Sequence, residues 1–444
     1  MREVTVGIDI GTTSVKAIAA DADGNVVRRA RIPHPLVVRD ATSFEHDAGR
    51  AWRRGPRRAL RAVEDGRVRA VSVSAMVPSI TAVNPRGVPM SPGLLYGDAR
   101  GRTSAHEGMA ETSEFLEFVR WTARQHPAAH GYWPAQSVAN HALGGQAVLD
   151  TTTAFTTLPL FAWTGWDAEV ARSVGVSVDQ LPRLVPTGQE AGRVGHDGPV
   201  LASGCVDVLA EQIVAGADYD GDVLVFLGTT LIVWVVVPEA SAPSAPGYLV
   251  VPHIAPGKML VGGPSNAGGL FLNWATRLLG SAGPVDDPAR VPVWVPYPRG
   301  ERVPLNDPTR RAELRDLDLT HDGPAAQRAA CEAMGFVTRR TIEASAVAAT
   351  RIVATGGGVR VEAWVQALAD CTGLPVDCVA VPDGAALGSA FLARMAAGLE
   401  MDMRDARRWA RTARRVEPDP HWMVAVKDRY ERFRELANGA EELR

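Results

Sequence analysis

The chain has little of what marks several specialised classes of protein. Four cysteines stand among 444 residues and none forms a C-x-x-C pair, so neither a disulfide framework nor a zinc ribbon is expected. A basic excess is missing too, because 47 Lys and Arg face 50 Asp and Glu for a net charge of −3. We therefore expect no nucleic-acid partner, since such binding needs a broad positive surface.

Long apolar runs are also missing from the sequence. The most apolar stretch, 223–237, is interrupted by Gly228-Thr229-Thr230 and predicts a buried hairpin instead of a membrane span. The first residues lack the apolar core of a signal peptide. Hydrophobic residues make up 46% and charged residues 22%, which are ordinary globular values. We expect a soluble, cytoplasmic protein with no membrane partner, whose length suggests two or three domains.

The chain opens with a strand pattern that recurs in its second half. Residues 4–9, 15–20 and 26–32 are joined by tight turns and predict an antiparallel meander that opens a mixed sheet. The same strand–turn–strand unit returns around Gly228, which predicts two domains of similar core topology. The acidic, glycine-flanked segment 216–222 is the expected linker, dividing domain 1–217 from domain 218–444.

Helical and strand periodicities alternate along the rest of the chain, which favours an α/β fold class. The expected helices are 47–64, 104–118, 129–149, 207–214, 324–350, 362–370, 384–397 and 420–437. The expected strands outside the two hairpins are 68–74, 80–83, 200–203 and 351–355.

Two turns of small residues suit phosphate binding. Asp9 ends the first strand, and Gly11, Thr12, Thr13 and Ser14 follow it. Small side chains let backbone N–H groups approach phosphate oxygens, hydroxyls add donors, and the carboxylate can hold Mg²⁺ through water. Gly228-Thr229-Thr230 is a second turn of this kind. Taken alone, the first turn is more often an ordinary hairpin, and for the second the two interpretations are about equally frequent.

Two further segments invite a chemical interpretation. Asp207 begins a predicted helix, where a carboxylate could take the proton from an attacking hydroxyl or simply cap its own helix. The glycines 356–358 end a strand, where they could admit a flat base or only supply a turn with positive φ. The dinucleotide fingerprint G-x-G-x-x-G is missing, so hydride chemistry gains no support.

Taken in order, these motifs resemble the FGGY carbohydrate kinases of the actin/hexokinase-like ATPase superfamily, nearest to the xylulokinase-like branch. The matching segments are 7–16, 204–210, 227–230, 356–358 with Trp364, Gln366, Ala369 and Asp370, and 385–390. The resemblance implies two actin-like ATPase domains of ribonuclease H-like topology, with a catalytic cleft between them.

The resemblance also implies roles for single residues. Asp9 would position Mg²⁺, and Asp207 would be the general base. Domain 1–217 would bind a small sugar or polyol, with a xylulose- or ribulose-like ketose expected first, and domain 218–444 would bind ATP. The expected ATP contacts are Thr12, Thr13, Ser14, Lys16, Thr229, Gly269, Asn273, Gly357, Gly358 and Glu362. A homodimer is left open.

The substrate side departs from the family pattern. The expected substrate contacts are Val77, Pro78, Asp98 and Arg100. Where xylulokinase-like members carry Gln-Met-His, this chain reads Met76-Val77-Pro78, which removes a polar contact to the sugar. An apolar wall discriminates acceptors weakly, so the usual ketopentose is not assured. Two alternatives stay open: a kinase of a hydroxylated signalling molecule, and a weakly catalytic regulator that binds sugar or ATP.

Overall fold

The computed structural model describes residues 3–39, 43–98, 100, 114–253, 255–280, 283–285, 287–307, 309–381 and 383–438. The chain divides into two units, here called unit 1 (1–214 and 383–409) and unit 2 (215–382 and 410–444). The chain first passes from unit 1 to unit 2 after residue 214, three residues before the expected boundary at 217/218. The sequence did not predict that the chain returns to unit 1 at residue 383.

The sheet of unit 1 is built on the predicted meander. Strands β1 (Val4–Ile10), β2 (Ser14–Ala20) and β3 (Val26–Pro33) pair antiparallel, which confirms that prediction. On the other side of β1, strand β6 (Val68–Ala75) runs parallel to it, and the full order is β12-β13-β6-β1-β2-β3. The short strand β14 (Cys205–Val206) also pairs with β6 in parallel.

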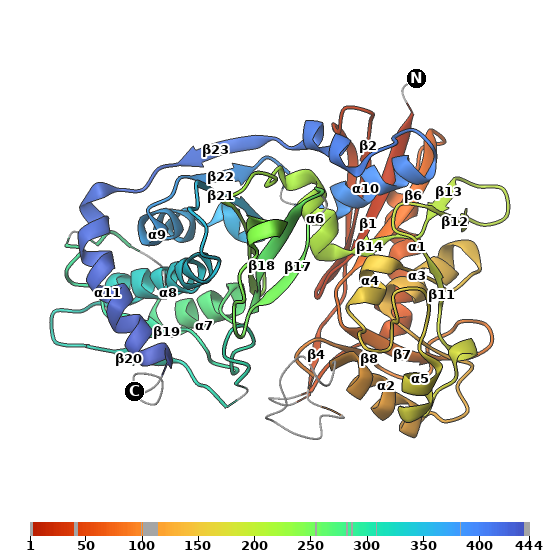
Figure 1. Ribbon diagram of the computed structural model, residues 1–444, viewed down its shortest axis with the longest axis horizontal. Coiled ribbons are helices and arrows are strands. Elements are labelled where there is room, and N and C mark those ends of the chain that lie inside the picture. The colour runs from red at the N-terminus through yellow and green to blue at the C-terminus, as the bar shows by residue number, and fades with distance from the viewer. Residues whose placement is uncertain are drawn as a thin grey trace. The chain divides into compact units, whose positions relative to one another are not determined.

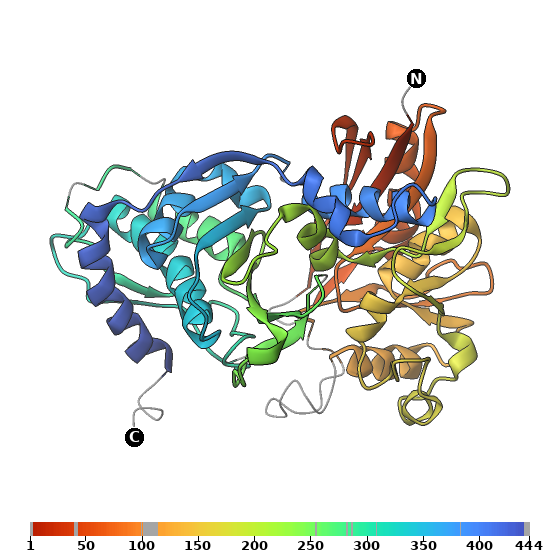
Figure 2. The same cartoon turned by 45° about the horizontal axis from the view of Figure 1, so that its top comes forward.

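Helices cover both faces of this sheet. Helix α1 (Gly55–Val63) packs over β1 and β2, and helix α3 (Ala135–Gly144) over β6, around one apolar core that includes Ile8 and Val15. Because side chains alternate along a strand, Gly7 and Asp9 point to the opposite face. Helix α10 (Gly384–Ala396) covers that second face (Figures 1 and 2).

Helix α10 lies so close to its neighbours that it requires glycine at two positions. A Cβ on Gly7 would lie 1.8 Å from the carbonyl oxygen of Ala386, and a Cβ on Gly388 would lie 1.7 Å from that of Ala210. The Thr5 hydroxyl also donates to the Ala390 carbonyl at 2.8 Å. One of the two helical layers that bury β1 therefore comes from a helix about four hundred residues further along the chain.

Two of the expected helices of unit 1 differ from the structure. The segment 129–149 is wrong as one helix, because Pro134 and Gly145 confine α3 to ten residues between strands β9 (Gly131–Trp133) and β10 (Val148–Asp150). Of the expected helix 104–118, residues 104–113 lie outside the described residues, and the rest belongs to α2 (Glu114–Gln125). Helix α2 packs against a small second sheet of order β4-β5-β8-β7-β9.

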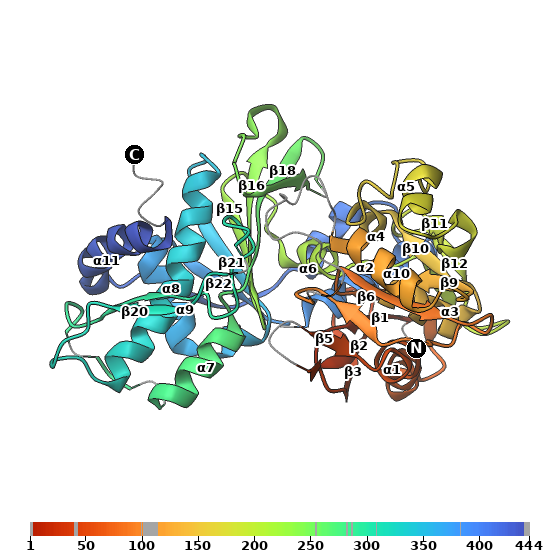
Figure 3. The ribbon, with the colours of Figure 1, turned by 90° about the horizontal axis from the view of Figure 1, so that it is seen from below.

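Unit 2 repeats the topology of unit 1. Strands β15 (Asp222–Leu227), β16 (Leu231–Pro238) and β18 (Lys258–Ser265) form a meander, and β21 (Arg351–Thr355) runs parallel to β15. The predicted duplication of core topology is thus confirmed. Helices gather on one face of this sheet around a single apolar core (Figure 3). They are α7 (Gly269–Leu279), α8 (Gly323–Ala344), α9 (Glu362–Thr372) and α11 (Pro420–Asn438).

The remaining elements are short. They are β4 (Val37–Val38), β5 (Phe44–His46), β7 (Ser79–Val83), β8 (Gly93–Leu95), α4 (Thr151–Phe155), α5 (Ala168–Ser173), β11 (Arg183–Val185), β12 (Glu190–Arg193), β13 (Val200–Ala202), α6 (Asp207–Ala215), β17 (Leu249–Pro252), β19 (Val293–Val295), β20 (Glu313–Arg315), β22 (Val376–Val379) and β23 (Thr412–Val416). In the part of the chain that the structure describes, no helix combines the length and apolarity needed to cross a bilayer.

Candidate active site

Strand register brings the two predicted carboxylates of unit 1 to one edge of its sheet. Strands β1, β6 and β14 are parallel neighbours, with Asp9 opposite Ser74 and Ser74 opposite Cys205. Asp207 follows Cys205 by two residues and begins α6. Because carboxyl ends of parallel strands meet at one edge, Asp9 and Asp207 lie close enough for their charges to interact.

Asp9 sits in a cluster of charged groups on the face covered by α10. Burial raises the pKa of Asp9, Lys16 works against that rise, and Asp383 adds to it. Lys16 is the β2 partner of Asp9 in the ladder, and its Nζ lies 3.2 Å from the Asp383 carboxylate. Burial opposes the charge of Lys16, but Asp9, Asp383 and Glu211 outweigh it and raise its pKa.

Asp207 has the electrostatics of a base that works near neutral pH. Burial and the charge of Asp9 raise the pKa of Asp207 to about 7. Its Oδ1 also accepts the N–H of the next residue, Val208, at 2.8 Å, which satisfies one backbone donor in the first turn of α6. A carboxyl group with a pKa near 7 is efficient at taking up and releasing a proton at that pH.

The edge of the sheet carries more negative than positive charge. Among the described groups, Asp9, Asp383 and Glu211 act on the ammonium of Lys16, and Asp9 also acts on Asp207. Within the described ranges, no cluster of three or more Asp, Glu, His or Cys could hold a metal ion without other ligands. This donor set fits Mg²⁺, which commonly uses one or two carboxylates and takes its other ligands from water and phosphate.

The three hydroxyl residues of the first hairpin have different surroundings. The Gly11 N–H donates to the Ser14 carbonyl at 3.1 Å and closes the turn. The Thr12 hydroxyl lies 2.6 Å from the Tyr96 hydroxyl, and Ser14 Oγ accepts from Arg31 Nε at 3.1 Å. Thr13 is exposed at the tip. Of the predicted hydroxyls, Thr13 is therefore the most accessible to a ligand.

A hydrogen bond from a buried histidine holds the first hairpin in place. Trp52 Nε1, which can only donate, gives its hydrogen bond to His46 Nδ1 at 3.0 Å. His46 Nε2 must then carry the proton that it donates to the Thr12 carbonyl at 2.7 Å. Burial and the nearby His34 lower the pKa of His46 to about 4, so the ring stays neutral and keeps this tautomer.

The predicted substrate residues fall into two groups. Val77 and Pro78 are partly buried directly after β6, and the Pro78 carbonyl accepts the Tyr96 N–H at 3.1 Å. Tyr96 therefore joins this apolar wall to the phosphate hairpin. Asp98 is fully buried and accepts from the Phe44 N–H at 2.7 Å and from the guanidinium of Arg100.

Arg100 is held rigidly by its neighbours. Its guanidinium also donates to Glu45 at 2.7 Å and lies over the Trp121 ring, 5.2 Å from the centroid. With 21% of its side chain exposed, Arg100 offers more surface to a ligand than Asp98, which is enclosed. The geometry makes Asp98 a group that orients Arg100.

In unit 2 the second hairpin is backed by the start of helix α7. The Gly269 N–H donates to the Gly228 carbonyl at 2.9 Å, and the Leu270 N–H to the Thr229 carbonyl at 3.1 Å. A Cβ on Gly269 would lie 2.7 Å from the Gly228 oxygen, so glycine is needed for this approach. Asn273 lies exposed further along α7.

The glycine turn adjoins the second hairpin. A Cβ on Gly358 would lie 2.6 Å from the Cβ of Leu227 and 2.5 Å from the Trp364 ring, whereas one on Gly357 would meet open space. Glu362 is exposed at the start of α9. Because β15 and β21 are parallel, the second hairpin and the glycine turn meet at one strand edge.

Sequence reasoning missed several groups at these edges. Glu211 follows Asp207 by one helical turn of α6, a spacing that could have indicated it. Asp383 stands just before a predicted helix, but nothing local connects it with Lys16. The interactions of Ser74 and His46 depend on tertiary packing alone.

Solved structures share the whole architecture. Gluconate kinase from Lactobacillus acidophilus is 21% identical with a TM-score of 0.83, covering 99% of this chain and 98% of that one. Xylulose kinase from Rhodospirillum rubrum is 25% identical with a TM-score of 0.80, covering 98% of each chain. The fold is the two-domain actin-like ATPase fold, which confirms the predicted class.

Family comparisons identify the chain more closely. The N-terminal and C-terminal domains of the FGGY family of carbohydrate kinases match residues 4–115 and 223–397. The chain belongs to this family and is a kinase, as the sequence predicts.

Curated relatives carry three different substrate names. Gluconokinase from Bacillus subtilis (strain 168) is 26% identical over 91% of this chain and 90% of its own length. Xylulose kinase from Escherichia coli (strain K12) is 24% identical over 97% and 98%. Glycerol kinase from Renibacterium salmoninarum is 26% identical over 98% and 96%. The family is therefore established without fixing the substrate.

Proposed function

We propose that this kinase transfers the γ-phosphate of ATP to a hydroxyl of a small sugar, sugar acid or polyol, with a xylulose- or ribulose-like ketose as the first candidate. The observation that carries the proposal is Asp207, a carboxyl group with a pKa of about 7 beside Asp9 at the strand edge. The relatives are named for gluconate, xylulose and glycerol, which are all small polyhydroxylated compounds.

Asp207 acts as the general base in this proposal. As the acceptor oxygen forms its bond to the γ-phosphorus, the hydroxyl proton passes to the Asp207 carboxylate and ADP leaves with the bridging oxygen. An Asp with an ordinary pKa near 4 would be a weak base. Burial beside Asp9 raises the affinity of Asp207 for a proton while leaving it ionised in about half of the molecules near pH 7.

The first hairpin and Asp9 suit the triphosphate and its metal ion. Asp9 and the hairpin from Gly11 to Ser14 would hold Mg²⁺ and the phosphates, and bound Mg²⁺ would offset negative charge on the transferring group. The excess of carboxylates over Lys16 supports this assignment, since a divalent cation relieves their repulsion. In unit 2, Thr229 and the glycine turn would contact ATP. That the first hairpin and these residues bind the same ATP molecule stays a prediction.

The apolar Val77–Pro78 wall bears on which acceptor is used. A hydrogen-bonding site rejects analogues strongly because buried polar groups would be left unpaired, whereas an apolar wall discriminates by shape. We therefore expect the acceptor to present a weakly polar part toward Val77 and Pro78, and its other hydroxyls toward Arg100.

A coupled assay of ADP release tests the proposal. The purified chain would be given Mg-ATP with D-xylulose, D-ribulose, D-gluconate, glycerol and related polyols in turn. We expect acceptor-dependent ADP release with one class clearly preferred by kcat/KM. ATP binding without acceptor-dependent ADP release on any of these compounds would overturn the proposal and favour a regulator.

A further inference from the structure

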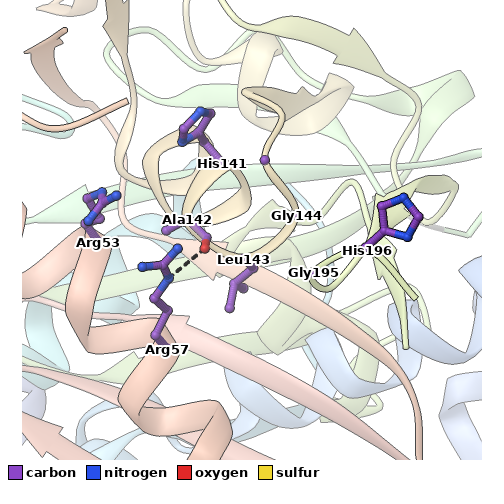
Figure 4. Close-up of a pocket in the computed structure, with 9 residues that line it drawn as sticks. Arg53, Arg57, His141, Ala142, Leu143, Gly144, Gly195 and His196 are labelled. Carbon is purple, nitrogen blue, oxygen red and sulfur yellow. Dashed lines mark hydrogen bonds between the residues drawn. The ribbon is translucent and has the colours of Figure 1, made fainter. Parts of the chain in front are cut away.

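Unit 1 contains a pocket that the proposed reaction does not use. It has a volume of about 370 Å³ and lies between α1, the end of α3 and the turn that joins β12 to β13 (Figure 4). Its side chains come chiefly from Arg53, Arg57, His141 and His196, and the backbone of 142–145 completes the wall. This volume falls within the usual range of small-molecule sites.

The pocket gathers two guanidiniums and two imidazoles, of which the exposed His196 pairs with the Asp197 carboxylate at 2.9 Å. None of the residues that line it is acidic. Burial and the neighbouring guanidiniums of Arg53 and Arg61 lower the pKa of Arg57. Burial, Arg53 and Arg57 also lower the pKa of His141. The Arg53 and Arg57 guanidiniums therefore repel one another, and an anion placed beside them would be stabilised.

Arg53 is the group whose hydrogen-bonding capacity is most clearly unmet. Its Nε is buried and has no hydrogen-bond partner among the described residues. The next residue, Arg54, by contrast lies 3.8 Å from the Asp47 carboxylate. A buried donor without a partner costs about 1–3 kcal/mol, so a ligand that supplies an acceptor would recover part of that cost.

The other two pocket groups are already held in place. Arg57 Nε donates to the Ala142 carbonyl at 2.6 Å, which leaves its terminal nitrogens on the side of Arg53 and His141 (Figure 4). The His141 ring lies 5.1 Å from the Trp133 ring, and a Cβ on Gly87 would lie 2.3 Å from it. Groups fixed before binding lose little entropy when a ligand arrives.

We propose that this pocket binds the phosphate group of a small phosphorylated metabolite. Guanidinium forks match the geometry of phosphate oxygens, and two of them converge here with an imidazole. A bare phosphate would leave much of a 370 Å³ space empty, which leaves room for the carbon chain of a phosphate ester against Leu143 and the glycine backbone.

Isothermal titration of the full-length protein tests the site, with a non-hydrolysable ATP analogue present so that the nucleotide site is filled. Inorganic phosphate and a sugar monophosphate are the two probes. We expect both to bind and the ester to bind more tightly than free phosphate. Equal or weaker binding of the ester would overturn the proposal of a metabolite site. So would the absence of binding heat with both probes.

Two variants locate the site. Arg53→Gln removes a side chain whose Nε has no hydrogen-bond partner among the described residues, so we expect an unchanged melting temperature and about tenfold weaker binding of the ester. Arg58→Gln is the matched control, since Arg58 is exposed on α1, which follows the helical turn Gly49–Arg54 that carries Arg53, and does not line the pocket. We expect less than about a twofold change there. Equal losses in the two variants would show diffuse surface attraction and overturn the proposal.

Discussion

The two units carry different side chains on one shared scaffold. When Gly11 of the first hairpin is aligned with Gly228 of the second, Asp9 corresponds to Phe226 and Lys16 to Val233. The strand edge of unit 1 therefore carries charged groups, whereas the corresponding turns of unit 2 offer threonine hydroxyls and glycine backbone. The shared topology supplies a place where strand ends meet, and the side chains at that place decide what it can do.

Each unit also contains a carboxyl group with a pKa raised to about 7, but in different surroundings. In unit 2, Glu301 is buried and accepts hydrogen bonds from Ser265 Oγ at 2.6 Å and from the Asn266 N–H at 2.9 Å. In unit 1, Asp207 is partly exposed beside Asp9. Similar pKa values therefore accompany a hydrogen-bonded, buried carboxyl group in one unit and the base that we propose in the other.

The largest expected effect comes from removing the proposed base. Asp207→Asn keeps the size of the side chain but cannot accept the proton, so we expect kcat to fall about a thousandfold. ATP binding, measured by titration, should change less than about twofold. Asp179→Asn, at an exposed position of unit 1, is the control and should keep full activity. Wild-type turnover in Asp207→Asn would refute the assignment of the base.

The pH dependence comes next in size. Asp207 must be ionised to accept a proton, so kcat/KM should fall about tenfold for each pH unit below the pKa of about 7. Because Glu301 has a similar pKa but serves unit 2, Glu301→Gln should leave this acid limb in place. If the acid limb of the pH profile disappeared in Glu301→Gln, the titrating group would be Glu301 of unit 2, and the proposed contrast between the two units would be wrong.

A pair of glycine substitutions tests how tightly the glycine turn of unit 2 packs against its neighbours. In Gly358→Ala the new methyl would press on Leu227 and Trp364, and we expect a loss of about 2 kcal/mol in the free energy of unfolding. Gly357→Ala, one residue earlier, enters open space and should cost less than about 0.5 kcal/mol. Denaturant unfolding measures both, and equal losses would contradict the observed packing.

The smallest expected effect lies in the second hairpin. Thr229→Val preserves shape and removes one hydroxyl, so we expect the KM for ATP to rise about tenfold with kcat nearly unchanged. Thr350→Val, an exposed site in unit 2, should change neither constant. A fall in kcat at constant KM would instead assign Thr229 to the reacting step, and unit 2 would then share in the chemistry.

Sequence reasoning succeeded where the signal is local. The meander and its repetition follow from β-branched strands and Gly-Thr turns, and the ordered motifs identify the family. It failed at 129–149, where helical periodicity continued across the breaks at Pro134 and Gly145. It also missed the charge contacts of Asp383, because residues far apart along the chain meet there only after packing. The cleft expected between the domains stays a prediction.

The late return of α10 to unit 1 has a consequence for how the protein is made. About 170 residues separate the two parts of unit 1, so on the order of 10 s of ribosomal elongation pass between them. During that interval one face of β1, including Thr5 and Gly7, has no cover. The nascent unit 1 therefore keeps one face of its sheet uncovered until a helix about 170 residues further along has been translated.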